Sequence, residues 1–199
     1  MNPEAAPPLW TQHLLRWLLA RDKEESVSGD LLEEYREAIV PARGPGSADV
    51  WYLKQVAGFL WRLSAVFALA MAAQVIVRNL FDAFAPPVTY RFRSEVTTYL
   101  GISTFLLAGA YGGFRTGRAR TGVLVAMTAS IVGHAISILF DAVMVTLSSP
   151  YAQSFVTTGD WGEALGLPPI ITIVAAAQGL LGGLFGKSVR SLGRRPQAG

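Results

Sequence analysis

The sequence has no cysteine and only two histidines, His13 and His134. Without cysteine the chain cannot form disulfides, thiolate nucleophiles or cysteine-ligated zinc sites. Two histidines do not favour a multi-histidine metal site, so we expect neither a metal nor a cofactor. Charged residues are also scarce, at 16% of the chain, whereas hydrophobic residues make up 51%. Because soluble domains carry about 25% charged residues, this composition is typical of a membrane protein.

The few charges are distributed unevenly along the chain. Residues 1–56 contain nine acidic and six basic residues, whereas residues 57–199 contain five acidic and eleven basic residues. The basic residues flank apolar stretches, so we interpret them as topology signals and as contacts with anionic lipid headgroups. We therefore expect membrane lipids as partners and no binding of nucleic acid.

The composition changes from polar to apolar between residues 51 and 62. We expect an all-α protein with three parts: a helical cytoplasmic domain at 1–56, a four-helix transmembrane bundle at 57–187, and a basic cytoplasmic tail at 188–199. An apolar helix needs about 20 residues to cross a hydrocarbon core of about 30 Å. Four stretches are long enough, at residues 57–81, 96–114, 121–145 and 169–187.

The loops indicate how the bundle is oriented. Arg115, Arg118 and Arg120 lie between the second and third stretches, and Lys187 at the end of the fourth is followed by three further arginines. The positive-inside rule therefore places both termini and the 115–120 loop in the cytoplasm. No basic leader precedes the apolar patch at residues 14–20, so we expect the first span itself to direct insertion.

The cytoplasmic part predicts short helices. The pattern at residues 9–20 predicts an amphipathic helix that either lies in the membrane interface or packs on the next helix. A second helix is expected to begin near Asp22, which has capping-box spacing to Glu25, and to end at Pro41. The glycine- and proline-rich segment at 43–47 predicts a flexible joint before the helix that enters the first span.

A short sequence recurs in the bundle. Leu-Phe-Asp-Ala occurs at residues 80–83 and again at 139–142. The repeat suggests two similar hairpins, produced by duplication and packed with approximate twofold symmetry. By this correspondence Asp141 lies near the outer headgroups, as Asp82 does. The alternative is an acid within the membrane, where ionisable groups are candidates for function.

The third stretch carries polar residues on one helical face. Its residues are Ser130, His134, Ser137 and Asp141. The last three follow Ser130 by four, seven and eleven residues, which places all four on one side of a helix. This face predicts either a proton relay or interhelical hydrogen bonds that fasten the bundle, and we favour the second. Gln74 and Arg78 of the first span and Gln178 of the fourth are the expected partners, with an ion pair between Arg78 and Asp141.

We do not expect an enzyme. Ser137 and His134 lie on one helix without a Gly-x-Ser elbow, and the sequence has no phosphate-binding loop or cluster of metal ligands. Small residues at four-residue spacing instead predict close helix packing in the second and fourth spans. These residues are Gly109 with Gly113, Ala175 with Gly179 and Gly183, and Gly182 with Gly186.

Residues 14–40 read LLRWLLARDKEESVSGDLLEEYREAIV, and residues 51–62 read WYLKQVAGFLWR. Together they resemble the permease prefix domain, which precedes the first membrane helix of bacterial ABC-type exporter permeases of the macrolide/lipoprotein-export class. The matching features are Arg21-Asp22, Gly29-Asp30-Leu31, Glu33-Glu34-Tyr35-Arg36, Trp51-Tyr52 and Gln55. The resemblance implies a bacterial inner-membrane setting and a link to an exporter or its regulator.

The rest of the chain departs from those permeases. They continue into a large extracytoplasmic domain, whereas the longest outer loop expected here has only about 20 residues. Transport activity is therefore not implied. We expect a non-catalytic adaptor or regulator associated with a transport system. Leu31, Glu34, Tyr35 and Trp51 are expected to dock a membrane-protein partner or the bundle's own inner face. The alternative is a small transporter or channel subunit that uses the polar face, as a homo-oligomer.

Overall fold

The computed structural model describes residues 5–20, 22–84, 90–147, 150 and 160–193, and its secondary structure in these residues is helical. The all-α fold is therefore confirmed. Four short segments come first: α1 (Leu9–Leu18), α2 (Glu24–Glu34), a π-helical turn η1 (Tyr35–Ile39) and α3 (Val40–Arg43). The long helices follow: α4 (Pro45–Phe84), α5 (Tyr90–Thr116), α6 (Ala119–Leu147) and α8 (Asp160–Gly193).

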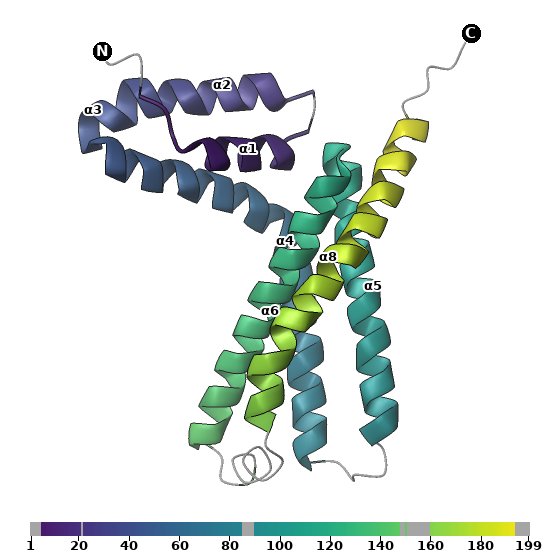
Figure 1. Ribbon diagram of the computed structural model, residues 1–199. Helices are drawn as coiled ribbons and strands as arrows, with labels where there is room; N and C mark the ends of the chain where they lie inside the picture. The colour runs from purple at the N-terminus through teal and green to yellow at the C-terminus, as the bar shows by residue number, and fades with distance from the viewer. Residues whose placement is uncertain (1–4, 21, 85–89, 148–149, 151–159, 194–199) are drawn as a thin grey trace.

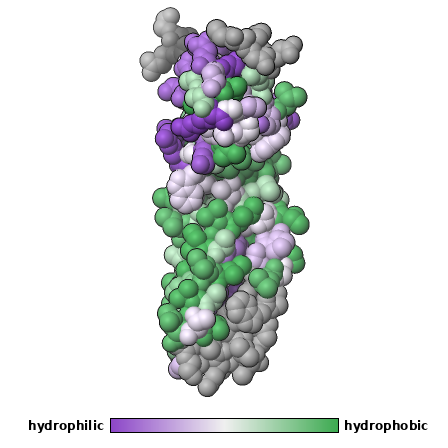
Figure 2. Space-filling model, turned by 90° about the vertical axis from the view of Figure 1, so that its left-hand side faces the viewer, coloured by the Kyte–Doolittle hydropathy of each residue, from purple (hydrophilic) through white to green (hydrophobic). Residues whose placement is uncertain are grey.

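Three of the long helices are long and apolar enough to cross a membrane, namely α4, α6 and the part of α8 at Leu165–Gly193. Helix α5 has 27 residues, but Thr97, Thr98, Ser103 and Thr104 make it less apolar. Figure 2 shows apolar surface over the long helices and polar surface at the end that carries the N-terminal helices. Soluble monomers rarely expose apolar patches larger than a few hundred Å².

The N-terminal unit consists of α1, α2, η1, α3 and residues 45–60 of α4. Its core contains Leu15, Leu18, Tyr35, Tyr52 and Val56, all buried. Helix α1 packs on α4 and also contacts α2, the next helix, and it buries Leu15 and Leu18 while Leu9 and Trp10 remain exposed.

The joint before α4 is shorter than the sequence suggested. The expected flexible segment at 43–47 is wrong, because only Gly44 interrupts the helices, with a φ of 75°. Glycine adopts this left-handed conformation without strain, and Pro45 is well suited to the first position of the next helix. The π-helical turn η1 comes just before Pro41, which has no N–H to donate and clashes with the carbonyl four residues earlier in a regular helix.

The second helix begins near Asp22 as expected, but Asp22 is not its N-cap residue. Helix α2 begins at Glu24, and its N-cap residue Lys23 forms no side-chain capping hydrogen bond. Asp22 instead forms an ion pair with Arg190 of α8, at 3.3 Å. A tertiary contact has therefore replaced the local cap.

Helix α4 connects the N-terminal unit to the bundle. Figure 1 shows that its first part runs along the N-terminal helices and that the helix then turns into the bundle. The hydroxyl of Ser64 donates to the carbonyl of Leu60 at 2.8 Å. Such a bond to the preceding turn often bends a helix, and it lies close to this change of direction.

The bundle is closed by glycine contacts between α5, α6 and α8. A Cβ atom at Gly113 would lie 2.2 Å from the carbonyl oxygen of Gly183, and one at Gly109 would lie 2.5 Å from that of Gly179. Gly122 of α6 is equally close to both of these helices. The predicted close packing is confirmed, because side chains at these positions would separate the helices.

The two hairpins are not packed equivalently. Helix α5 packs closely on α6, whereas its counterpart pair, α4 and α8, is not among the closely packed pairs of the described residues. The approximate twofold symmetry suggested by the repeated Leu-Phe-Asp-Ala sequence is therefore not visible in the contacts between helices.

Candidate functional site

The polar face of α6 (Ser130, His134, Ser137 and Asp141) lies inside the bundle. None of the four residues is more than 6% exposed. Met71 and Ala68 of α4 pack against α6 at Gly133, where a Cβ would lie 2.8 Å from the Met71 side chain. Helix α4 on one side and α8 on the other enclose this face, so it lies in the interior of the bundle.

Ser130 and His134, the first two residues of this face, form hydrogen bonds within α6 and from α6 to α8. The Nδ1 atom of His134 lies 2.7 Å from the carbonyl oxygen of Ser130, which can only accept, so this nitrogen carries the proton. The hydroxyl of Ser130 lies 3.0 Å from the hydroxyl of Thr172 in α8. The bond between Ser130 and Thr172 links the two helices in the way expected of interhelical fastening, whereas the His134 bond lies within α6.

Asp141, the last residue of this face, contacts α4. The amide of Asn79 donates to the carboxylate of Asp141 at 2.9 Å. Arg78 forms an ion pair with Asp82, one turn further along α4, at 3.2 Å. The expected pairing of Arg78 with Asp141 stays a prediction. Arg93 of α5 also binds Asp82, at 2.9 Å. The Asp82 carboxylate therefore joins α4 to α5, and Asp141 joins α6 to α4.

Two glutamines complete the polar residues of the bundle. The amide of Gln74 in α4 donates to the hydroxyl of Thr104 in α5 at 2.7 Å. The side-chain oxygens of Gln74 and Gln178 are buried and have no hydrogen-bond partner among the described residues. Gln178 is thus inside the bundle as expected, but the structure gives its oxygen no contact with the polar face of α6.

The arrangement does not resemble a hydrolase. The hydroxyl of Ser137 donates to the backbone carbonyl of His134 at 2.9 Å and so is not directed at an imidazole nitrogen. A serine nucleophile needs a base within hydrogen-bond reach and an oxyanion hole. Within the described part of the chain, no group of three or more histidine, aspartate or glutamate residues could hold a metal ion.

The four residues expected to dock a partner differ in exposure. Tyr35 is 2% exposed, and its ring packs edge-on against Tyr52 with centroids 6.0 Å apart. Its hydroxyl donates to Asp49 at 2.7 Å. Glu34 is exposed, whereas Leu31 and Trp51 are half-buried. Tyr35 is therefore an internal contact of the N-terminal unit, and Glu34 is the most accessible of the four.

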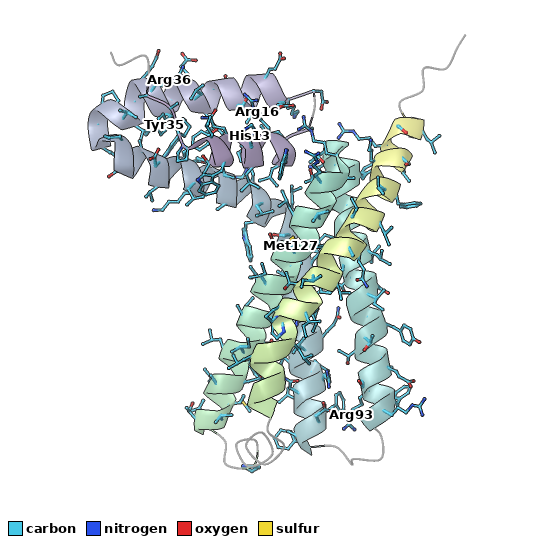
Figure 3. The ribbon with its side chains drawn as sticks, in the orientation of Figure 1. His13, Arg16, Tyr35, Arg36, Arg93 and Met127 are labelled. Carbon is cyan, nitrogen blue, oxygen red and sulfur yellow. The ribbon has the colours of Figure 1, made fainter. Side chains whose placement is uncertain are left out.

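Burial of Tyr35 has an electrostatic consequence. Desolvation, followed by the hydrogen bond to Asp49 and the charge of that carboxylate, raises the pKa of the Tyr35 phenol to about 12. The neutral phenol is therefore the form that fits this core. Figure 3 shows Tyr35 in the N-terminal unit and Arg93 at the opposite end of the molecule.

Three arginines hold the N-terminal unit on one end of the bundle. Arg118 pairs with Glu24 of α2, and Arg190 pairs with Asp22. The guanidinium of Arg120 lies over the ring of Trp17 in α1, 5.5 Å from its centroid. We call these three arginines and their partners the arginine clasp. The Thr121 hydroxyl adds a hydrogen bond to the backbone carbonyl of Trp17.

Sequence reasoning missed several of these residues. The clasp joins residues 94 and 168 positions apart in the chain, and local spacing carries no signal for such contacts. Asn79 could have been found, because it continues the buried face of α4 formed by Ser64, Ala68 and Met71. In comparisons with protein-family models, curated proteins and solved structures, no match to this chain was found.

Proposed function

We propose that the protein is a non-catalytic adaptor or regulator of the bacterial inner membrane, with α5 as a fourth span and both ends of the chain in the cytoplasm. The orientation is supported by the basic residues of the α5–α6 turn and of the end of α8. Figure 1 shows both at the end of the bundle that carries the N-terminal unit. Positive charge is typical of the cytoplasmic end of membrane helices.

The arginine clasp is the observation that carries the proposal. It uses the topology-determining arginines to fix the N-terminal unit on the bundle, and α4 runs through both as one helix. A unit held in this way transmits a contact at its surface to the membrane helices more directly than a domain on a flexible linker. The other acidic residues of α2 remain exposed, namely Glu25, Asp30, Glu33 and Glu34. Figure 1 places most of α2 on the side of the N-terminal unit away from the long helices.

The resemblance to the permease prefix domain indicates the kind of partner. It supports a membrane-protein partner that belongs to an export system or its regulation, and it supports no transport activity for this chain. Within the N-terminal unit, Glu34 and the half-buried Leu31 offer accessible surface for such a partner. Tyr35 and Tyr52 act behind this surface by fixing η1 on α4.

Photo-crosslinking from single positions in living cells tests this proposal. A photoreactive residue at Glu34 is expected to form an adduct with one membrane protein, which mass spectrometry identifies. The same residue at Arg91, an exposed position at the opposite end of the molecule, is the matched control. A Glu34 position that yields no protein adduct, or the same adducts as Arg91, contradicts the adaptor function.

A small transporter or channel subunit is the second candidate. The buried, unpartnered oxygens of Gln74 and Gln178 favour it, because such atoms are normally satisfied by water or a ligand. Flux of protons or solutes in proteoliposomes, abolished by Asp141→Asn or His134→Ala, would establish this function. If the adaptor proposal is right, neither substitution changes partner crosslinking.

A further inference from the structure

The first part of α4 has two opposite faces. One is buried in the N-terminal unit through Tyr52 and Val56. On the other side Val50 is 52% exposed and Trp61 is 46% exposed. We call this second side the basal face; its residues are Val50, Leu53, Lys54, Ala57 and Trp61. Figure 1 places this part of α4 on the side of the N-terminal unit nearest the long helices, with α2 on the far side.

The basal face carries positive charge and no acid. The sequence from residue 50 to residue 81 contains no aspartate or glutamate. A shallow cleft of about 370 Å³ opens on this face; it is lined by Arg43, Gly46, Ser47, Val50, Trp51 and Lys54. The acidic residues of the unit are concentrated in α2 and η1 instead. Apart from Asp22 and Glu24, which pair with arginines of the bundle, the unit carries its acidic residues away from the basal face, which is basic and aromatic.

The basal face is continuous with the apolar surface of the bundle. Helix α4 runs without interruption from this face to Val66 and Leu69, which are 70% and 56% exposed. Val50 is eleven residues from Trp61, about 16 Å along the helix at 1.5 Å per residue. Figure 1 shows this stretch running obliquely to the long helices before α4 turns into the bundle. A helix at this angle would lie along the surface of a membrane that the bundle spans.

We propose that the basal face binds the phosphate-bearing headgroups of anionic phospholipids, with Arg43 and Lys54 contacting phosphate and Val50, Leu53 and Trp61 entering the interface. Tryptophan and basic residues are the side chains that membrane interfaces favour. Lipid bound here supports the N-terminal unit from below while the arginine clasp holds it from the side. The inference rests on the proposed membrane insertion of α4, and the experiment separates the two.

Fluorescence quenching of the full-length protein in nanodiscs tests the inference, because the cysteine-free chain allows a single labelled cysteine. Val50→Cys reports the basal face, Leu69→Cys reports the span, and Glu33→Cys reports the far side. The nanodiscs contain phosphatidylcholine and phosphatidylglycerol, and either lipid carries a spin label in its headgroup. We expect the label at position 50 to be quenched more strongly by phosphatidylglycerol, and the label at position 33 by neither lipid.

Charge substitutions make the test specific. Lys54→Gln is expected to lower the preference for phosphatidylglycerol at position 50 by up to about fivefold, since each basic residue near an anionic surface contributes about 1 kcal/mol. Arg36→Gln is the control, because Figure 3 shows Arg36 on the side of the unit away from the bundle, and this substitution should leave the preference unchanged. The preference should also persist when inorganic phosphate is added, since the ligand is a lipid headgroup.

Several results would overturn the inference. Equal quenching by both lipids, or competition by free phosphate, would exclude an anionic-lipid site. Protection of position 50 from aqueous iodide without quenching by either lipid would mean that another protein, such as a second copy of the chain, covers the face. If position 69 is quenched by a lipid spin-labelled in its acyl chain and position 50 by no lipid, only this inference fails. If position 69 is not quenched, the proposed insertion of α4 fails as well.

Discussion

Replacing Gly113 by alanine is expected to weaken the contact between α5 and α8. The new methyl group would lie 2.2 Å from the carbonyl oxygen of Gly183, whereas nonbonded atoms prefer about 3.5 Å or more. The two helices must therefore move apart by about 1 Å. Overpacking of this kind typically costs about 1–3 kcal/mol. The backbone atoms of both helices are in the way, so a side-chain rotation cannot relieve the contact.

Gly101→Ala on the same helix is the matched control. No atom lies within 4 Å of a Cβ at that position, and alanine is favoured over glycine in helices by up to about 1 kcal/mol. Because this gain in helix propensity is common to both variants, we expect them to differ by the overpacking cost alone, about 1–3 kcal/mol in the free energy of unfolding. Unfolding in mixed micelles of mild detergent and SDS, followed by circular dichroism, measures this difference. Equal stability of the two variants would refute the close approach of α5 and α8.

Three further predictions concern the polar contacts. Folding raises the pKa of Tyr35 to about 12, so the contribution of Tyr35 to stability is present below about pH 10 and is lost as the pH rises toward 12, where phenolate forms. Tyr35→Phe should remove this part of the pH dependence of the free energy of unfolding, and an unchanged pH profile would contradict the prediction. Arg118→Gln and Glu24→Gln should show a coupling of about 0.5–1 kcal/mol in a double-mutant cycle, and additive effects would contradict the clasp. Asn79→Ala removes the amide that donates to the carboxylate of Asp141 and should lower the free energy of unfolding by about 1–3 kcal/mol in the same assay. The double variant Asn79→Ala/Asp141→Leu should regain most of this stability. No regain would mean that the two side chains do not act together.

The helical fold and the places of the long helices were predictable from the sequence because they depend on the period of apolar stretches. The lengths were not: α4 (Pro45–Phe84) and α8 (Asp160–Gly193) extend well beyond the expected spans at 57–81 and 169–187. The helix boundaries near residue 44 were not predictable either, since one glycine with a positive φ ends α3 and lets α4 begin at Pro45. Composition indicated a loose joint there, because glycine and proline are common both in flexible loops and at sharp helix ends.

The polar face of α6 was also predictable, since four residues at helical spacing must share a side of the helix. Its partners were not predictable in the same way. Asn79 and Arg78 are adjacent in the chain but lie about 100° apart around α4, and the rotation of that helix decides which one faces Asp141. Packing at Met71 and Gly133 sets this rotation, and it becomes visible only when both helices are placed together.

The central claim is that the N-terminal unit and the end of α8 share the cytoplasmic side of a membrane-spanning bundle. Single cysteines introduced as Asp30→Cys, Leu192→Cys and Phe92→Cys can be labelled with a membrane-impermeant maleimide in spheroplasts, because all three positions are exposed. We expect position 92 to react in intact spheroplasts and positions 30 and 192 to react only after permeabilisation. Reaction of position 30 or 192 in intact spheroplasts would contradict the account.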